Sequence, residues 1–275
     1  MLFTFKTEGR SHGRELLRLC LLFWWIFFCP VLGCTVNCTG NVPEGHLGDC
    51  RLGERTRIGS TIHTAATVSI QAFSSRDFTF EIRAQSGAHI GYVSGRAALT
   101  GHNRAVFVGE NGCVIGFVLQ GDILDITTSE GCTWYGGAGV CFDGEYRSDV
   151  EITKPSLSDQ GIFDAQSQEK VFHELTGPAY LLFLENAHLV FTGEDLDGFG
   201  ATVYELGVRG LLGFMGAIVM VGQGGEMWAA VTDGALVKYF TSEVAGVKLP
   251  RTIEAWRARF TGKDLVFMNR DNFEY

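Results

Sequence analysis

Short runs in which apolar and polar residues alternate are the feature that most limits what this chain can fold into. Phe78, Phe80 and Ile82 would share one face of an extended strand, while the residues between them face the other way. Gly, Asn, Asp and Ser separate such runs, and the 36 glycines of the chain are typical of short strands joined by turns. The spacing predicts an all-β protein of the sandwich or barrel class. Further strands are expected at 67–70, 105–108, 114–119, 123–127, 180–184, 203–208, 217–221, 236–240 and 251–260.

The order of these expected strands repeats along the chain. In each half, one segment ends in Ala-His followed by an aliphatic residue, at His89 and at His188. The matched segments are 80–90 with 180–189, 106–109 with 203–207, and 159–163 with 263–267. Three matches in one order favour an internal duplication. We therefore expect two tandem β-sandwich domains of jelly-roll type, at 56–166 and 167–275, preceded by a cysteine-containing segment at 34–55.

The N-terminus has the pattern of a secretory signal. Arg10, Arg14 and Arg18 precede an apolar run at 19–33 that is broken at Pro30. A positive flank followed by a short apolar segment and small residues is typical of a signal peptide. We expect residues 1–33 to be removed and the protein to be secreted, with an uncleaved signal anchor at the membrane as the alternative.

The cysteines fit an oxidising compartment. Of eight cysteines, Cys20 and Cys29 lie in the signal, which leaves six, and disulfides are expected outside the cytosol. A staple between Cys132 and Cys141 across a glycine-rich segment is the first expectation, whereas zinc is disfavoured because no CxxC pair occurs. Asn37 begins a glycosylation sequon. The disulfide candidates are Cys34, Cys38, Cys50, Cys113, Cys132 and Cys141.

Composition excludes some classes of partner. The chain has 46% hydrophobic and 19% charged residues, which argues against disorder, and a formal net charge of −9. Because it has no block of Lys or Arg, nucleic acid and anionic lipid are not expected as the main partner. Small molecules, glycans and proteins remain as ligand classes.

Several segments are similar to the farnesoic acid O-methyltransferase-like domain of animals. In the second half they are residues 186–191, 204–208 and 254–267, while the first half keeps Ala-His-Ile at 88–90 and Phe-Val-Gly at 107–109. The resemblance implies a β-sandwich and suggests methyl transfer from S-adenosylmethionine. The chain lacks a strand-turn-helix with a glycine-rich loop for such a cofactor, and the glycine cluster at 222–225 is better interpreted as a hairpin turn. We therefore expect no cofactor, and the family name describes the fold.

Candidate site residues are few, and none is proposed as catalytic. His89 and His188 occupy equivalent repeat positions, and a histidine satisfied beside its strand is the simpler interpretation. Trp134, Tyr135 and Trp256 are candidates for stacking on a ligand, although most aromatic residues of a small β-domain lie in its core. Glu194, Asp195 and Asp197 gather three carboxylates before a glycine and could hold calcium, but a solvated turn is the competing interpretation.

Two functions follow from these expectations. The first is a secreted or surface-displayed, non-catalytic binding or adhesion protein built of these domains. The second is an enzyme that methylates a farnesoic-acid-like terpenoid carboxylate, which requires a deep apolar pocket with a convergent acid or base. The sequence favours the first.

Overall fold

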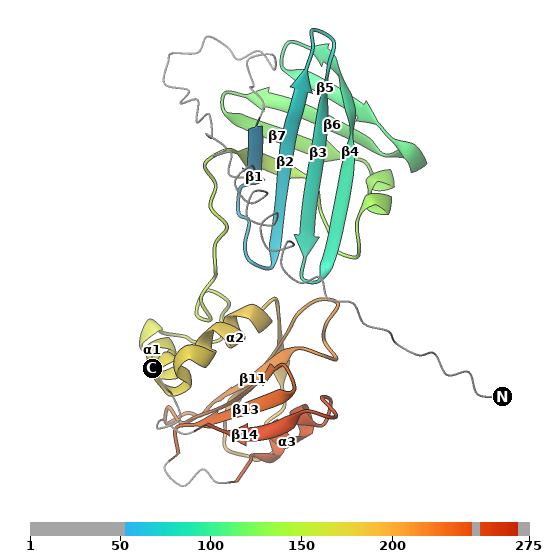
Figure 1. Cartoon of the computed structure of the whole chain (residues 1–275). Coiled ribbons are helices and arrows are strands. Elements are labelled where there is room, and N and C mark those ends of the chain that lie inside the picture. Colours follow the sequence, from blue (N-terminus) through green and yellow to red (C-terminus); the bar gives the residue numbers. More distant parts are fainter. Residues whose placement is uncertain (1–52, 244–247, 269–275) are drawn as a thin grey trace, which may run out of the picture. The chain divides into compact units, whose positions relative to one another are not determined.

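The computed structural model describes residues 53–243 and 248–268, and it is mostly β (Figure 1). The expected signal at 1–33, the sequon at Asn37, and Cys34, Cys38 and Cys50 lie outside these residues. Within them, no helix is both long and apolar enough to cross a membrane.

The first half is a closed barrel in which every strand pairs antiparallel with the next and β8 returns to β1. Its register at the closure pairs Thr56 with Arg147 and Arg57 with Tyr146. Two 3-10 turns interrupt it, η2 (Glu110–Gly112) and η3 (Glu130–Tyr135). The strands are β1 (Gly53–Arg57), β2 (Thr64–Phe73), β3 (Asp77–Ser86), β4 (His89–Gly101), β5 (Arg104–Val108), β6 (Val114–Gln120), β7 (Ile123–Thr128) and β8 (Gly144–Arg147).

The barrel core follows from the alternation in the sequence. Phe78, Phe80 and Ile82 on β3 are buried, as predicted, while Thr79 and Glu81 lie at intermediate depth on the other face. The rings of Phe78 and Phe80 meet Phe117 of β6 edge-on, with centroids 5.3 and 4.9 Å apart. Such aromatic pairs contribute about 0.5–1.5 kcal/mol each beyond the burial of area.

The second half is a six-stranded sheet covered on both faces by helices. The strand order is β14-β13-β12-β11-β10-β9, and only the β13–β14 pair is parallel. The elements are α1 (Gln166–Thr176), η4 (Gly177–Ala179), α2 (Tyr180–Asn186), β9 (Leu189–Gly193), β10 (Thr202–Gly207), β11 (Gly216–Val221), β12 (Met227–Asp233), β13 (Leu236–Thr241), α3 (Arg251–Arg257) and β14 (Asp264–Phe267).

Alternation along the central strands divides this half into two cores. On β11, Ala217 and Val219 pack under α1 and α2 in one cluster. Ile218 and Met220 face the opposite side and pack with Trp256 of α3. A sheet with both faces buried explains why its central strands are almost continuously apolar.

Two predicted strands are helices, so those predictions were wrong. Residues 180–184 lie in α2 and residues 251–257 in α3. In the first case the buried positions include Ala179, Phe183 and Ala187, four residues apart, which is the spacing of one helix face. In α3, Ile253 and Trp256 are buried three residues apart.

The two halves also differ in topology, which corrects the expectation of two like sandwiches. The first is a closed barrel and the second an open, helix-covered sheet. Segment 80–82 lies in strand β3, whereas its match at 180–182 lies in helix α2. A short apolar run fits both the two-residue repeat of a strand and the 3.6-residue repeat of a helix, so two similar sequence segments can adopt different secondary structures.

Candidate functional site

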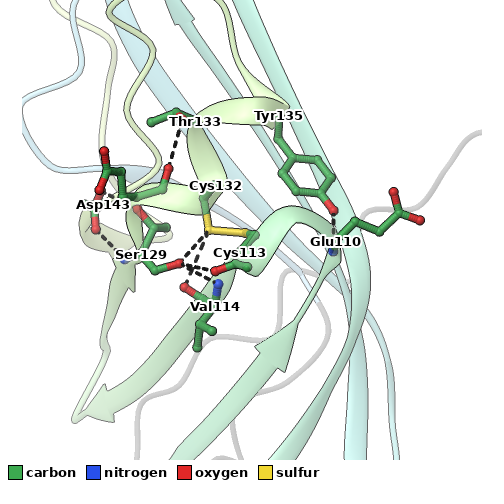
Figure 2. The surroundings of a disulfide bond; sticks show 11 residues. Glu110, Cys113, Val114, Ser129, Cys132, Thr133, Tyr135 and Asp143 are labelled. Atoms are coloured by element: carbon green, nitrogen blue, oxygen red, sulfur yellow. Dashed lines mark hydrogen bonds between the residues drawn. A yellow bond between two sulfur atoms is a disulfide. The ribbon is translucent and has the colours of Figure 1, made fainter.

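A disulfide joins the two 3-10 turns at one end of the barrel (Figure 2). Cys113 follows η2 and Cys132 lies in η3, with their Cα atoms 4.3 Å apart. The β6–β7 register, which pairs Ile115 with Thr128, brings the residue before β6 next to the chain after β7. The expected Cys132–Cys141 staple is therefore wrong. Cys141 is exposed and is a free cysteine in the described part of the chain.

Hydrogen bonds fix the same end of the barrel. The Ser129 hydroxyl donates to the carbonyl of Gly112 over 2.9 Å and accepts the N–H of Val114 over 2.8 Å. Tyr135, one of the predicted ligand residues, is partly buried, and its hydroxyl accepts the N–H of Glu110 over 3.1 Å (Figure 2). The end of the barrel is thus cross-linked by covalent and polar contacts.

Exposed apolar side chains lie on the elements near this end of the barrel. Gly91 of β4 forms a backbone bridge with Gly136, just after η3. The two backbones lie so close that a Cβ on Gly91 would be 3.1 Å from the Gly136 Cα. This bridge pairs the chain just after η3 with the backbone of β4, and Trp134 lies two residues before it. We define the barrel-end patch as Ile90, Tyr92, Val108, Val114 and Trp134, which are 77%, 49%, 71%, 39% and 75% exposed.

Each of the two predicted histidines, His89 and His188, lies close to backbone of a neighbouring segment. His89 begins β4, and Gly137 approaches it so closely that a Cβ there would lie 2.8 Å from its Nδ1. The Nδ1 of His188 accepts the N–H of Arg209 over 3.3 Å, and burial lowers the pKa of His188. A neutral His188 fits this accepting role.

Two of the three candidate calcium ligands, Asp195 and Asp197, accept backbone N–H groups. Asp195 accepts the N–H groups of Asp197, Gly198 and Ala201 at 3.1, 3.0 and 3.1 Å. Asp197 accepts the N–H groups of Arg251 and Thr252 at 2.8 and 2.9 Å, and the Thr252 hydroxyl at 2.8 Å. Asp197 therefore caps the start of α3.

Its environment keeps Asp197 charged, and Glu194 takes no part. Partial burial raises the pKa of Asp197, but the hydrogen bonds from the Thr252 and Arg251 N–H groups lower it by a larger amount. The pKa is therefore below its usual value. Glu194 is exposed. Over the described residues, no three His, Cys, Asp or Glu side chains gather closely enough to hold a metal.

Trp256 lies in the core rather than on the surface. It is 3% exposed, and its ring centroid is 4.8 Å from that of Phe260. Together these rings line a hollow of about 290 Å³, whose rim carries Phe191, Leu212 and the Glu205–Arg259 ion pair.

A second hollow, of about 450 Å³, lies beside α1 and was not anticipated from the sequence. Glu169 accepts the hydroxyl of Tyr180 and the N–H of Leu157 over 2.7 Å. Burial raises the pKa of Glu169, but the hydrogen bonds from Ser158, Tyr180 and Leu157 outweigh it and lower the pKa overall. Burial and the adjacent Glu169 raise the pKa of Tyr180. Glu169 therefore remains a carboxylate and Tyr180 a neutral phenol, and their hydrogen bonds hold the segment before α1 at Leu157.

The glycine cluster at 222–225 joins β11 to β12, which confirms the predicted hairpin turn. Gly222 donates its N–H to the carbonyl of Glu226 over 2.8 Å.

Comparisons of this chain with models of protein families, with curated proteins and with solved structures found no match.

Proposed function

We propose that this chain is a non-catalytic binding protein, secreted or displayed at the cell surface, that contacts its partner through the barrel-end patch. One observation carries the proposal: Ile90, Trp134 and Val108, the three most exposed large apolar side chains of the barrel, lie on β4, η3 and β5 near its disulfide-linked end. The structural disulfide supports the expected oxidising compartment.

The fixed backbone supports a role in binding. A surface that is already ordered loses little conformational entropy when it binds, so more of the contact energy appears as affinity. Trp134 is 75% exposed, and Trp and Tyr are frequent anchors of protein interfaces. The patch therefore has the features of an interface centre before any partner arrives.

The composition of the patch favours a protein partner. Ile90 and Val108, 77% and 71% exposed, add aliphatic surface to the rings of Tyr92 and Trp134. Aliphatic groups gain by contact with other apolar groups, whereas a sugar needs hydrogen-bonding side chains beside a stacked ring. We therefore propose an apolar protein surface as the ligand.

A panel of purified extracellular protein domains, with a glycan array in parallel, tests this proposal. A bound domain should lose at least tenfold in affinity when Trp134→Ala or Ile90→Lys is introduced, because truncation of an interface anchor costs about 2 kcal/mol or more. Leu181→Lys is the matched control, since Leu181 is an exposed apolar residue of α2 outside the patch. Domain binding that is unaffected by both patch variants would contradict the proposal, as would binding to glycans alone.

The alternative suggested by the family resemblance makes a different prediction. An enzyme of that kind would transfer the labelled methyl group of S-adenosylmethionine to farnesoic acid. Turnover by the purified protein, lost on mutation of residues lining either hollow, would overturn the non-catalytic proposal.

A further inference from the structure

Strand β9 forms one edge of the second sheet. It pairs with β10 over five consecutive positions, from Leu189 opposite Gly207 to Gly193 opposite Val203. In residues 53–243 and 248–268, no strand pairs with its outer edge. Such an edge presents backbone N–H and C=O groups that can accept another strand.

The five residues of this edge strand include no charged residue and no proline, and they form no bulge. Edges are commonly protected by charged residues, proline or a bulge. The sequence of β9 is Leu-Val-Phe-Thr-Gly, and its register with β10 is unbroken. At the opposite edge, β14 is shorter and begins with Asp264. The two edges of the sheet therefore differ in how well they are protected.

Apolar surface accompanies the free edge. Val190 and Phe191 are 37% and 48% exposed and point to opposite faces of the strand. Phe191 and Leu212 line the hollow of about 290 Å³ above Trp256. Leu212, 50% exposed, packs over Gly207 of β10, where a Cβ would lie 2.3 Å from its Cδ2 atom. An added strand would bury backbone polar groups and apolar side chains together.

We propose that β9 pairs antiparallel with β9 of a second copy of this chain, across a two-fold axis at Phe191. The sequence is self-complementary in this register, because Phe191 faces Phe191 and Val190 faces Thr192 of the second copy. Aromatic and β-branched cross-strand pairs stabilise antiparallel sheets. The charges of Glu205 and Arg259, close to Phe191, already form an ion pair, with 2.7 Å between Oε2 and Nη2, so these two charges compensate one another.

Net charge provides an independent signature of this interface. Two chains that each carry −9 repel one another, and salt screens that repulsion. An interface of backbone hydrogen bonds and apolar side chains should therefore strengthen as salt rises. An interface built on ion pairs would weaken.

Sedimentation velocity of the purified full chain, over a range of protein and salt concentrations, tests the dimer. We expect reversible dimerisation that is stronger at high salt. Phe191→Lys and, on the other face of the strand, Val190→Lys should each weaken dimerisation at least tenfold. Leu181→Lys, at an exposed apolar site of α2, should leave it unchanged. Thermal unfolding checks that each variant is folded, and two edge variants keep the test valid if one fails to fold.

Hydrogen exchange locates the contact. Backbone amides of β9 should become more protected as the protein concentration rises, while those of β14 should not. A monomer at all concentrations overturns the proposal, and so does a dimer that persists in both edge variants or leaves the protection of β9 unchanged. Binding through the barrel-end patch is measured separately, so failure here leaves the proposed function standing.

Discussion

Replacement of Asp197 by Ala should destabilise the second half of the protein without affecting any metal. Asp197 accepts two N–H groups at the start of α3 and the hydroxyl of Thr252. Thr252 is 5% exposed, so its N–H and hydroxyl would lose a partner where water has little access. The perturbation thus acts on one cap between a loop and a helix.

The expected cost follows from these contacts. Loss of a side-chain helix cap costs about 0.5–2 kcal/mol, and a hydrogen bond to a charged group contributes roughly 1.5–3 kcal/mol. Because the carboxylate is partly solvated, we take the upper end of the capping range. The free energy of unfolding should fall by about 2 kcal/mol in Asp197→Ala.

Urea unfolding followed by tryptophan fluorescence measures this cost. Trp228 and Trp256 are 4% and 3% exposed and report on the second half, whereas Trp134 is already 75% exposed and should change little. Glu194→Ala is the matched control, because Glu194 is an exposed neighbour in the same loop. It should change stability by less than about 0.5 kcal/mol.

Acid adds a check on the sign. The pKa of Asp197 is lowered in the folded state, so its stabilisation is present above the unfolded value of about 3.9 and is lost as pH falls through the folded pKa. The difference between wild type and Asp197→Asn should therefore be constant near neutral pH and shrink below about pH 4. Excess calcium should not change either protein. Calcium stabilisation that Asp197→Asn abolishes would refute the capping role and restore the metal-site interpretation.

Two further predictions concern the barrel and the buried tyrosines. Cys113→Ser with Cys132→Ser should lower barrel stability by about 2–4 kcal/mol, as for other disulfides of similar loop length, and non-reducing peptide mapping should recover one cross-linked peptide containing both cysteines. Burial raises the pKa of Tyr239 to about 12, and also raises that of Tyr146, whose hydroxyl donates to the Phe142 carbonyl over 2.6 Å. Since an unfolded phenol ionises near 10, the contribution of these two phenols to stability should be constant below about pH 10 and fall above it. Absorbance at alkaline pH should show both phenols titrating only as the protein unfolds, and free titration in the folded state would contradict their burial.

The sequence predicted the barrel strands because alternation is unambiguous where one face is buried. On β3, Phe78, Phe80 and Ile82 leave only one face for the core. At 180–184 the run Tyr-Leu-Leu-Phe-Leu does not alternate between apolar and polar residues. The helical spacing of three or four becomes evident only when the preceding buried residues Phe172, Leu175 and Ala179 are included. Local pattern therefore determined strands that alternate, and it failed at 180–184, where five consecutive apolar residues lie in a helix that buries only Phe183 and Leu184 of them.

The site could be predicted only where its contacts are local. The hairpin turn at 222–225 was recognisable from its glycines, and residues 194–198, where acidic residues precede a glycine, form a loop. The partner of Asp197 at Thr252, and the pairing of Cys113 with Cys132, depend on strand order and register. Cysteines separated by a short loop attracted the first disulfide prediction, whereas the β6–β7 hairpin selected the more distant pair. Exposure of Trp134 and burial of Trp256 likewise follow from tertiary packing.

The two proposed contact surfaces differ for a topological reason. Every strand of the closed barrel has a hydrogen-bonded neighbour on each side, so we propose that the barrel-end patch offers a partner side chains rather than a strand edge. The second sheet is open, and β9 can offer backbone as well as Phe191. Recognition at the barrel should therefore depend on the identity of side chains such as Trp134 and Ile90, whereas pairing at β9 should tolerate changes that keep the strand apolar and extended. A dimer formed through β9 would also carry two barrel-end patches. A partner with repeated binding sites would then bind the dimer more tightly than it binds one chain, although the patch itself is unchanged.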